Sequence, residues 1–276
     1  MENILDDIKT TTAFIKNKIQ NFEPDYGVVL GSGLGGFSGA MKILFELPYT
    51  QIPNFPVSTV KGHGGKLIFG LLGEKKVVAM SGRFHFYEGY SMQQVAFPIR
   101  VMKFLGIKKL FISNASGGLN PAQKIGDLMI IKDHISLLPT NPLLGKNIDE
   151  LGTRFPDMSE PYDKELIEKG LAIAAKNNIS CAAGVYVGVT GPCFESPAEY
   201  KYMHIIGGDA VGMSTVPEVI AARHMLLPVF AIAVITDLGV TDNPVKITHE
   251  EVIAAANAAE STMSLIIKEL IGGDEL

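Results

Sequence analysis

The sequence predicts an α/β fold with a mixed, largely buried central sheet. Short apolar runs of strand length alternate along the chain with segments that have helical spacing. This alternation is typical of sheets that are covered by helices. The chain has 276 residues, of which 47% are hydrophobic, so it can bury a sizeable core. Since no repeat, low-complexity segment or linker divides it, we expect one domain over residues 1–276.

The residues that begin and end the elements support this interpretation. Gly106 ends one predicted helix, and Thr248 with Glu251 forms a capping box at the start of another. Gly73 and Glu74 separate two apolar runs, as in a hairpin. In chain order, helices are expected at residues 3–20, 92–105, 163–178, 197–206, 216–225 and 248–270. Strands are expected at residues 28–30, 66–72, 75–80, 108–113, 127–131, 181–190, 210–213 and 229–235.

Charge and cysteine content argue against several classes of protein. A net charge of −5 does not suit a polyanion-binding surface, so no nucleic-acid partner is expected. Cys181 and Cys193 form neither a disulfide scaffold nor a metal-binding spacing, which fits a reducing compartment. The first residues are acidic, unlike a signal peptide, and the longest apolar run contains Pro228 and is too short to span a bilayer. We therefore expect a cytoplasmic protein with no membrane partner.

A glycine-rich segment follows the first predicted strand. Residues 26–36 read YGVVLGSGLGG, an apolar run and then a loop whose backbone can approach an anion closely. Ser32 in this loop is either a donor to a phosphate or an ordinary turn serine. Three of the glycines also match the dinucleotide pattern G-x-G-x-x-G, so an NAD-dependent dehydrogenase is one alternative. Three prolines between residues 48 and 56 argue against it, because they interrupt the place of its second strand.

Several predicted strands stop at polar or glycine-rich segments, where ligands gather in open α/β sheets. Arg83 and His85 follow one strand and are one residue apart, so in an extended chain both point to the same side. A guanidinium beside an imidazole suits an oxyanion such as phosphate. The ordinary alternative is a surface arginine and a structural histidine. Asn114 follows another strand at a predicted glycine-rich turn, where the backbone alone favours asparagine.

Other candidate residues suit a polar ring. Glu195, beside Phe194, is either an acceptor of two N–H bonds from an amide-like ligand or a helix-start acid. Asp237 is either a partner for a ring nitrogen or amine or part of an Asx-turn. Ser214 and Thr215 precede a predicted helix, so either of them could be its N-cap. A ligand contact and a packing or surface role both stay open for Tyr87, His249 and His63.

The sequence shows no metal-ligand spacing, nucleophile elbow, supported Cys–His pair or P-loop lysine. The candidates that remain describe a site for a phosphate-type anion next to an apolar wall and groups for a polar ring. No metal and no cofactor are expected.

Nine sequence blocks occur in order over residues 25–270. They read LGSGLGG, FPVSTVKGHGGKL, GRFHFYEGY, FPIRVMKFLG, NASGGLNP, GDLMIIKDHI, RFPDMS, GPCFESPAE and DAVGMSTVPEVIAARH. Together they resemble the trimeric purine nucleoside phosphorylase family. The resemblance implies one α/β domain with a mixed, barrel-like central sheet flanked by helices, assembled as a homotrimer. It also implies purine salvage by reversible phosphorolysis of purine (deoxy)ribonucleosides, chiefly inosine and guanosine, to free base and (deoxy)ribose 1-phosphate with inversion at C1′.

The resemblance further implies which residues form the site, with inorganic phosphate as co-substrate. Phosphate is expected at Ser32, Arg83, His85, Asn114, the Ala115 backbone and Ser214, with His63 on a loop nearby. The ribose is expected at Tyr87, Met213 and His249, and the base at Phe194, Glu195 and Asp237. The catalytic residues are expected to be His85, Glu195 and Asp237. Phe155, in a long aperiodic loop over residues 139–161, is expected to reach a neighbouring subunit's site.

Two positions depart from the family pattern. Asp237 stands where the family usually has asparagine, and Ser116 where it often has alanine. An ionised Asp237 suits a 6-amino group, whereas a protonated one could donate to N7 of the purine. A 5′-methylthioadenosine-type or adenosine-accepting phosphorylase is therefore an alternative, although Glu195 and His249 argue against the former. A non-catalytic nucleoside-binding module is another, in which Arg83 would have no phosphate to hold.

Overall fold

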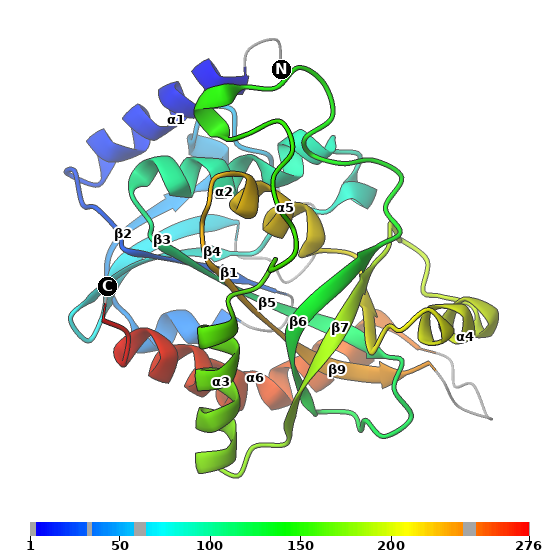
Figure 1. The fold of residues 1–276 in the computed structure, drawn as a ribbon. Coiled ribbons are helices and arrows are strands. Elements are labelled where there is room, and N and C mark those ends of the chain that lie inside the picture. The colour runs from blue at the N-terminus through cyan, green and yellow to red at the C-terminus, as the bar shows by residue number, and fades with distance from the viewer. Residues whose placement is uncertain (1–3, 32–34, 58–64, 240–246, 276) are drawn as a thin grey trace.

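A mixed sheet forms the centre of the molecule (Figure 1). The structure is a computed structural model and describes residues 4–31, 35–57, 65–239 and 247–275. Nearly all residues of the first and last strands are buried, which explains why these segments read as continuous apolar runs. The strands in the described ranges are β1 (Tyr26–Leu30), β2 (Lys42–Pro48), β3 (Lys66–Leu72), β4 (Lys75–Ser81), β5 (Lys109–Gly118), β6 (Leu128–Ser136), β7 (Cys181–Gly188), β8 (Ala210–Gly212) and β9 (Val229–Leu238).

The sheet closes on itself over part of its width. Its strand order is β2-β3-β4-β1-β5-β8-β7-β6-β9, and β5 pairs in addition with β9. The strands β5, β8, β7, β6 and β9 therefore form a closed, barrel-like unit, and the other four strands extend it beyond β5. Parallel pairs such as β1–β4 and β5–β9 occur together with antiparallel pairs such as β3–β4. The prediction of a mixed, barrel-like sheet is confirmed.

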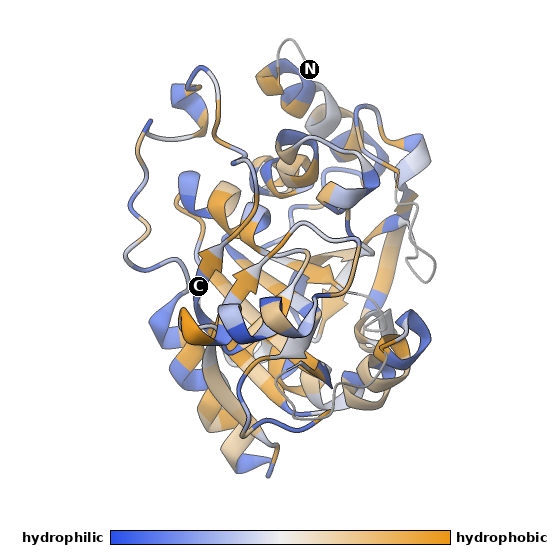
Figure 2. Cartoon of the chain, turned by 90° about the vertical axis from the view of Figure 1, so that its right-hand side faces the viewer, coloured by the Kyte–Doolittle hydropathy of each residue, from blue (hydrophilic) through white to orange (hydrophobic). Residues whose placement is uncertain are grey.

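Helices cover both faces of the sheet (Figure 1). On one face, α2 (Met92–Leu105) packs against α1 (Ile4–Lys18) and α5 (Val216–His224). On the other, α3 (Lys164–Lys176) packs against α6 (His249–Gly272), and α4 (Pro197–Ile205) lies beside the barrel. Figure 2 shows the apolar residues concentrated on the central strands. Within the described ranges, none of the helices has the length and hydropathy that crossing a membrane requires.

The region after the glycine-rich segment differs from the prediction. Sequence analysis placed no strand there, but β2 pairs antiparallel with β3 at the edge of the sheet, where its terminal Pro48 is tolerated. A short 3-10 helix (Gly35–Ala40) lies between β1 and β2 in place of an α-helix, and the parallel neighbours of β1 are β4 and β5. The glycine motif therefore lacks the βαβ unit that a dinucleotide site needs, which disfavours the dehydrogenase alternative.

Three strands run at least three residues further than predicted. β6 continues past Ile131 to Ser136. β5 continues through Asn114 to Gly118, so the turn predicted after Ser113 is wrong. β9 likewise continues past Ile235 to Leu238. The long parallel ladder between β5 and β9 keeps both extended, with a register shift after Ser116. The polar side chains in this part of the chain are therefore carried by the barrel itself and not by flexible turns.

Candidate active site

One cavity, of about 110 Å³, collects most of the predicted site residues. The strands β1, β4, β5 and β9 run in the same direction, and their carboxyl-terminal parts border it. The predicted residues that line it are Arg83, His85, Tyr87, Asn114, Ala115, Phe194, Glu195, Met213, Ser214, Asp237 and His249. Ser32 and His63 lie outside the described residues. Phe155 is 87% exposed and does not line the cavity of its own chain.

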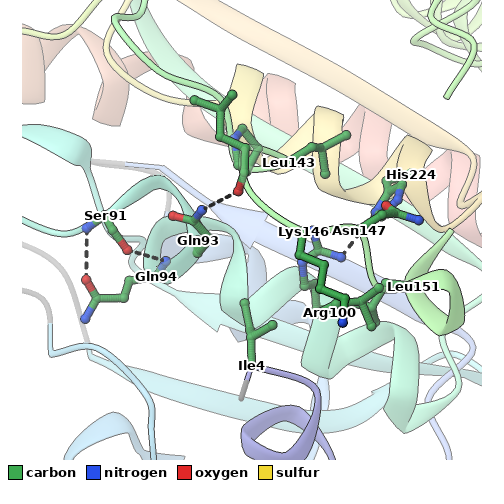
Figure 3. A pocket seen from close by; sticks show the side chains of 13 residues that line it. Ile4, Ser91, Gln93, Gln94, Arg100, Leu143, Lys146, Asn147, Leu151 and His224 are labelled. Atoms are coloured by element: carbon green, nitrogen blue, oxygen red, sulfur yellow. Dashed lines mark hydrogen bonds between the residues drawn. The ribbon is translucent and has the colours of Figure 1, made fainter. Parts of the chain in front are cut away.

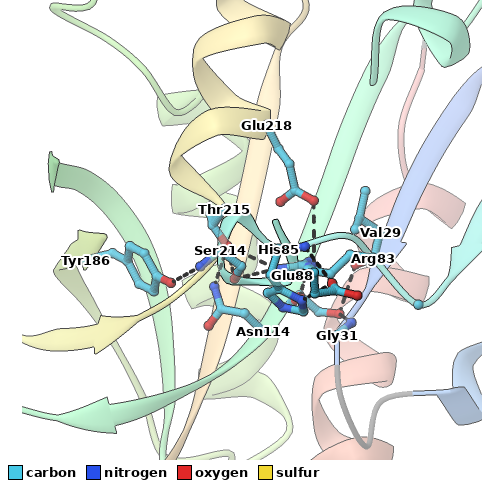
Figure 4. A network of polar contacts seen from close by, with 12 residues as sticks. Val29, Gly31, Arg83, His85, Glu88, Asn114, Tyr186, Ser214, Thr215 and Glu218 are labelled. Carbon is cyan, nitrogen blue, oxygen red and sulfur yellow. Dashed lines mark hydrogen bonds and ion pairs between the residues drawn. The ribbon is translucent and has the colours of Figure 1, made fainter. Parts of the chain in front are cut away.

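Arg83 is the buried cation of this cavity and is held from three sides (Figure 4). Its Nη1 donates to Ser214 Oγ over 2.7 Å, and its Nη2 donates to the backbone oxygen of Ser113 over 2.6 Å. Glu218 Oε1, on α5, lies 3.7 Å from Arg83 Nε. Arg83 is only 1% exposed, so these contacts are desolvated and fix the plane of the guanidinium.

A residue in an uncommon backbone conformation links Arg83 to Asn114. Thr215 has φ +66° and ψ −55°, a conformation that is rare for a β-branched residue and that often occurs at functional sites. Its Oγ1 accepts from Asn114 Nδ2 over 2.8 Å and from Arg83 Nη1 over 3.3 Å. Although Thr215 occupies the N-cap position of α5, its side chain makes no capping hydrogen bond. Ser116 Oγ donates to Asn114 Oδ1 over 2.7 Å, so this polar cluster extends along β5.

His85 lines the same cavity and is paired with Glu88. Glu88 Oε1 accepts from the His85 backbone N–H over 2.8 Å and lies 3.1 Å from His85 Nδ1. The Tyr87 ring stacks on the imidazole with a centroid separation of 4.7 Å. Burial raises the pKa of Tyr87 to about 12, so its phenol stays protonated at neutral pH.

Two carboxyl groups share one phenol in another part of the cavity. Tyr200 Oη donates to Asp237 Oδ2 over 3.2 Å and also hydrogen-bonds to Glu195. Thr236 Oγ1 donates to Asp237 Oδ1 over 2.9 Å. Burial raises the pKa of both Glu195 and Asp237. Tyr200 has a single O–H and can donate to only one of the two carboxyl groups. A proton on the other carboxyl group lets that group donate to Tyr200 Oη, so that both contacts are hydrogen bonds.

Sequence analysis missed three side chains that organise this cavity. Glu88 stands three residues after His85, which is the spacing of a capping box, but histidine is not a preferred N-cap residue, so this signal was weak. Glu218 was detectable as the acid in the apolar first half of the helix VPEVIAARH, where a charged residue is rarely buried without a partner. Tyr200 carried no comparable signal, because its contact with Asp237 joins residues that are 37 positions apart.

Comparison with known proteins decides the family. The phosphorylase superfamily matches residues 25–272. The purine nucleoside phosphorylase 1 of Geobacillus stearothermophilus is 46% identical over 266 residues, which cover 96% of each chain. The purine nucleoside phosphorylase of Mus musculus is 44% identical over 280 residues, which cover 98% of this chain and 96% of the mouse protein. This chain belongs to the purine nucleoside phosphorylase family.

Solved structures of purine nucleoside phosphorylases share the fold over the whole chain. The crystal structure of the Schistosoma mansoni enzyme in complex with adenosine has a TM-score of 0.93 at 43% identity, and covers 99% of this chain and 98% of that one. A Schistosoma purine nucleoside phosphorylase in complex with guanosine has a TM-score of 0.92 at 42% identity with the same coverage. The family predicted from the nine sequence blocks is therefore confirmed.

Proposed function

We propose that this chain catalyses the reversible phosphorolysis of purine (deoxy)ribonucleosides, chiefly inosine and guanosine. The products are the free base and (deoxy)ribose 1-phosphate, with inversion at C1′. The observation that carries the proposal is a single cavity in which Arg83 and its hydroxyl and amide neighbours lie together with the carboxyl groups of Glu195 and Asp237. The first group suits a phosphate dianion and the second a purine. Solved relatives that are described in complex with inosine and guanosine support it.

Arg83 is the centre of the proposed phosphate site, with Asn114, the Ala115 backbone and Ser214 as neutral donors and His85 beside them. Breakage of the bond between C1′ and N9 leaves positive charge on the sugar, which a phosphate dianion beneath C1′ stabilises. A phosphate oxygen then forms the new bond to C1′, and the electron pair of the broken bond passes to the purine. Because this single displacement needs no covalent intermediate on the protein, the site requires no nucleophilic side chain.

Glu195 and Asp237 are the proposed base partners. Glu195 accepts from N1–H and the 2-amino group of a 6-oxopurine, and Phe194 forms the wall of the base site. A protonated Asp237 donates to N7 as negative charge develops on the leaving purine. Its burial and its contact with Tyr200 support the protonated form. In this form aspartic acid offers a donor, as the asparagine that the family usually has at this position does.

The remaining roles follow the family pattern. Tyr87, Met213 and His249 contact the ribose, and all three line the cavity. Phe155 completes a neighbouring subunit's site in a homotrimer, a role that its 87% exposure suits. The reaction uses inorganic phosphate and no cofactor, and Ser32 and His63 complete the phosphate site. We place the enzyme in purine salvage in the cytoplasm.

A substrate panel with a matched variant tests the proposal. Inosine, guanosine and adenosine are incubated with phosphate and either the wild type or Glu195→Ala, and base release is followed by ultraviolet absorbance. We expect the wild type to cleave inosine and guanosine, and Glu195→Ala to lose on the order of a hundredfold in kcat/KM because the N1–H acceptor is gone. Absence of base release with all three nucleosides would overturn the proposal.

A further inference from the structure

A second and larger cavity, of about 520 Å³, lies apart from the proposed catalytic site. It forms where the start of α2 and the end of α5 meet a loop over residues 142–151 (Figure 3). Its volume is in the range of small-molecule sites. Among the described residues, the lining contains the cationic residues Arg100 and Lys146 and no aspartate or glutamate. The proposed phosphorolysis makes no use of it.

Arg100, on α2, is a buried cation whose charge is balanced by no carboxylate of the residues that the structure describes. The residue is 3% exposed, and its Nε has no hydrogen-bond partner in the described part of the chain. Among the same residues, no carboxylate forms an ion pair with it. Burial lowers the pKa of Arg100 to about 10, so the guanidinium is still charged at neutral pH. A buried, unpaired guanidinium is costly unless an anion joins it.

The contact that Arg100 does make is to a neutral ring. His224 Nε2 lies 3.0 Å from the backbone oxygen of Thr153, so this nitrogen carries the ring proton. His224 Nδ1 is then a lone-pair acceptor, 3.4 Å from Arg100 Nη1. Burial, followed by the charge of Arg100, lowers the pKa of His224 and keeps the ring neutral. His224 therefore orients the guanidinium without compensating its charge.

The rest of the cavity would suit an anion that has an apolar part. Lys146 adds a second cation from the exposed side. Ser91, the N-cap of α2, and the first-turn residues Gln93 and Gln94 also line the cavity, and a helix N-terminus favours negative charge nearby. Leu143 and Leu151 form apolar walls. Figure 3 shows Arg100 and His224 at one end of the cavity and Ser91 at the other.

We propose that this cavity binds a small organic anion, a phosphate ester or carboxylate with an apolar body, whose charged group pairs with Arg100. The planar fork of the guanidinium matches either group in two-point contact. The site is separate from the phosphate site at Arg83, so the chain would hold two anions at once.

Titration calorimetry with phenyl phosphate as the probe tests the proposal. The proteins are the wild type, Arg100→Met and Lys9→Met, a matched control that removes a cation from the exposed side of α1. We expect two equivalents per chain for the wild type and Lys9→Met, and one for Arg100→Met. Arg100→Lys keeps the charge but loses the fork, so it should bind the second equivalent on the order of tenfold more weakly. Circular dichroism and urea unfolding establish that each variant is folded.

Two results would overturn the proposal. One is an unchanged stoichiometry in Arg100→Met. The other is that the wild type binds a single equivalent of phenyl phosphate and that Arg100→Met forms a smaller assembly than the wild type by light scattering. This result would mean that another copy of the chain occupies the cavity. Because the stoichiometry is read without turnover, failure of the proposed phosphorolysis would leave this result interpretable.

Discussion

Arg83 and Glu218 form a buried ion pair at the proposed phosphate site, and substitutions in this pair should affect the free energy of unfolding and phosphate binding to different extents. Arg83→Met removes the cation and leaves the Glu218 carboxylate, whose side chain is 3% exposed, without its partner. Loss of one member of a buried ion pair costs about 3–5 kcal/mol, because the remaining charge is uncompensated. We expect the free energy of unfolding to fall by about that amount. Phosphate binding should weaken roughly ten- to a hundredfold, because charge-assisted hydrogen bonds to the dianion are lost.

A second substitution distinguishes the two effects. Glu218→Gln in the Arg83→Met background removes the buried charge while keeping the shape of the side chain, so it should restore about 2 kcal/mol of stability. It should leave the KM for phosphate raised, since the cation is still absent. Urea unfolding at matched protein concentration and initial rates at varied phosphate measure the two quantities. A double variant no more stable than Arg83→Met, or one with a normal KM for phosphate, would refute this reasoning.

Three further predictions concern the base site and assembly. Asp237→Asn should still cleave inosine. In the wild type, kcat/KM should fall as pH rises through the raised pKa of Asp237, because the carboxyl group then loses the proton that it donates. Asp237→Asn should not show this alkaline decrease, and a decrease shared by both proteins would contradict the prediction. Tyr200→Phe removes the O–H between Glu195 and Asp237 and should raise the KM for inosine roughly fivefold to tenfold. The control Tyr202→Phe, on the exposed side of α4, should leave this KM unchanged. Equal KM values for the two variants would contradict the bridging role of Tyr200. Phe155→Ala should lower kcat/KM for inosine about tenfold, because it removes an apolar contact from the neighbouring subunit's site. The fold of its own chain, in which Phe155 is exposed, should stay intact by circular dichroism. Unchanged kinetics would exclude its role in a neighbouring site.

The parts of the fold that depend on local signals were predictable from the sequence. The last helix was expected at residues 248–270 and is found at His249–Gly272, with the capping box at Thr248 as predicted. Helix α2 ends before Gly106, which adopts the left-handed conformation with φ 116°. Caps and periodicity act within a few residues, so a single sequence displays them.

The parts that depend on pairing between distant segments were not predictable in the same way. Asn114 looked like a turn residue because Gly117 and Gly118 follow it, but the ladder with β9 keeps this segment extended. The contact of Arg83 with Ser214 joins residues that are 131 positions apart. The polar ends of several predicted strands pointed to a common site, and the resemblance of the nine sequence blocks to a known family assigned Arg83 and Ser214 to its phosphate part. Tyr200 lay in none of the expected roles and was therefore missed.

The dependence of inosine cleavage on phosphate tests the central claim most directly. Hypoxanthine release is measured at increasing concentrations of inorganic phosphate, and the sugar product is identified by proton and phosphorus magnetic resonance. We expect no hypoxanthine release without phosphate, and α-ribose 1-phosphate as the only sugar product when phosphate is present. Release of free ribose in the absence of phosphate, or binding of inosine without cleavage at any phosphate concentration, would contradict the central claim.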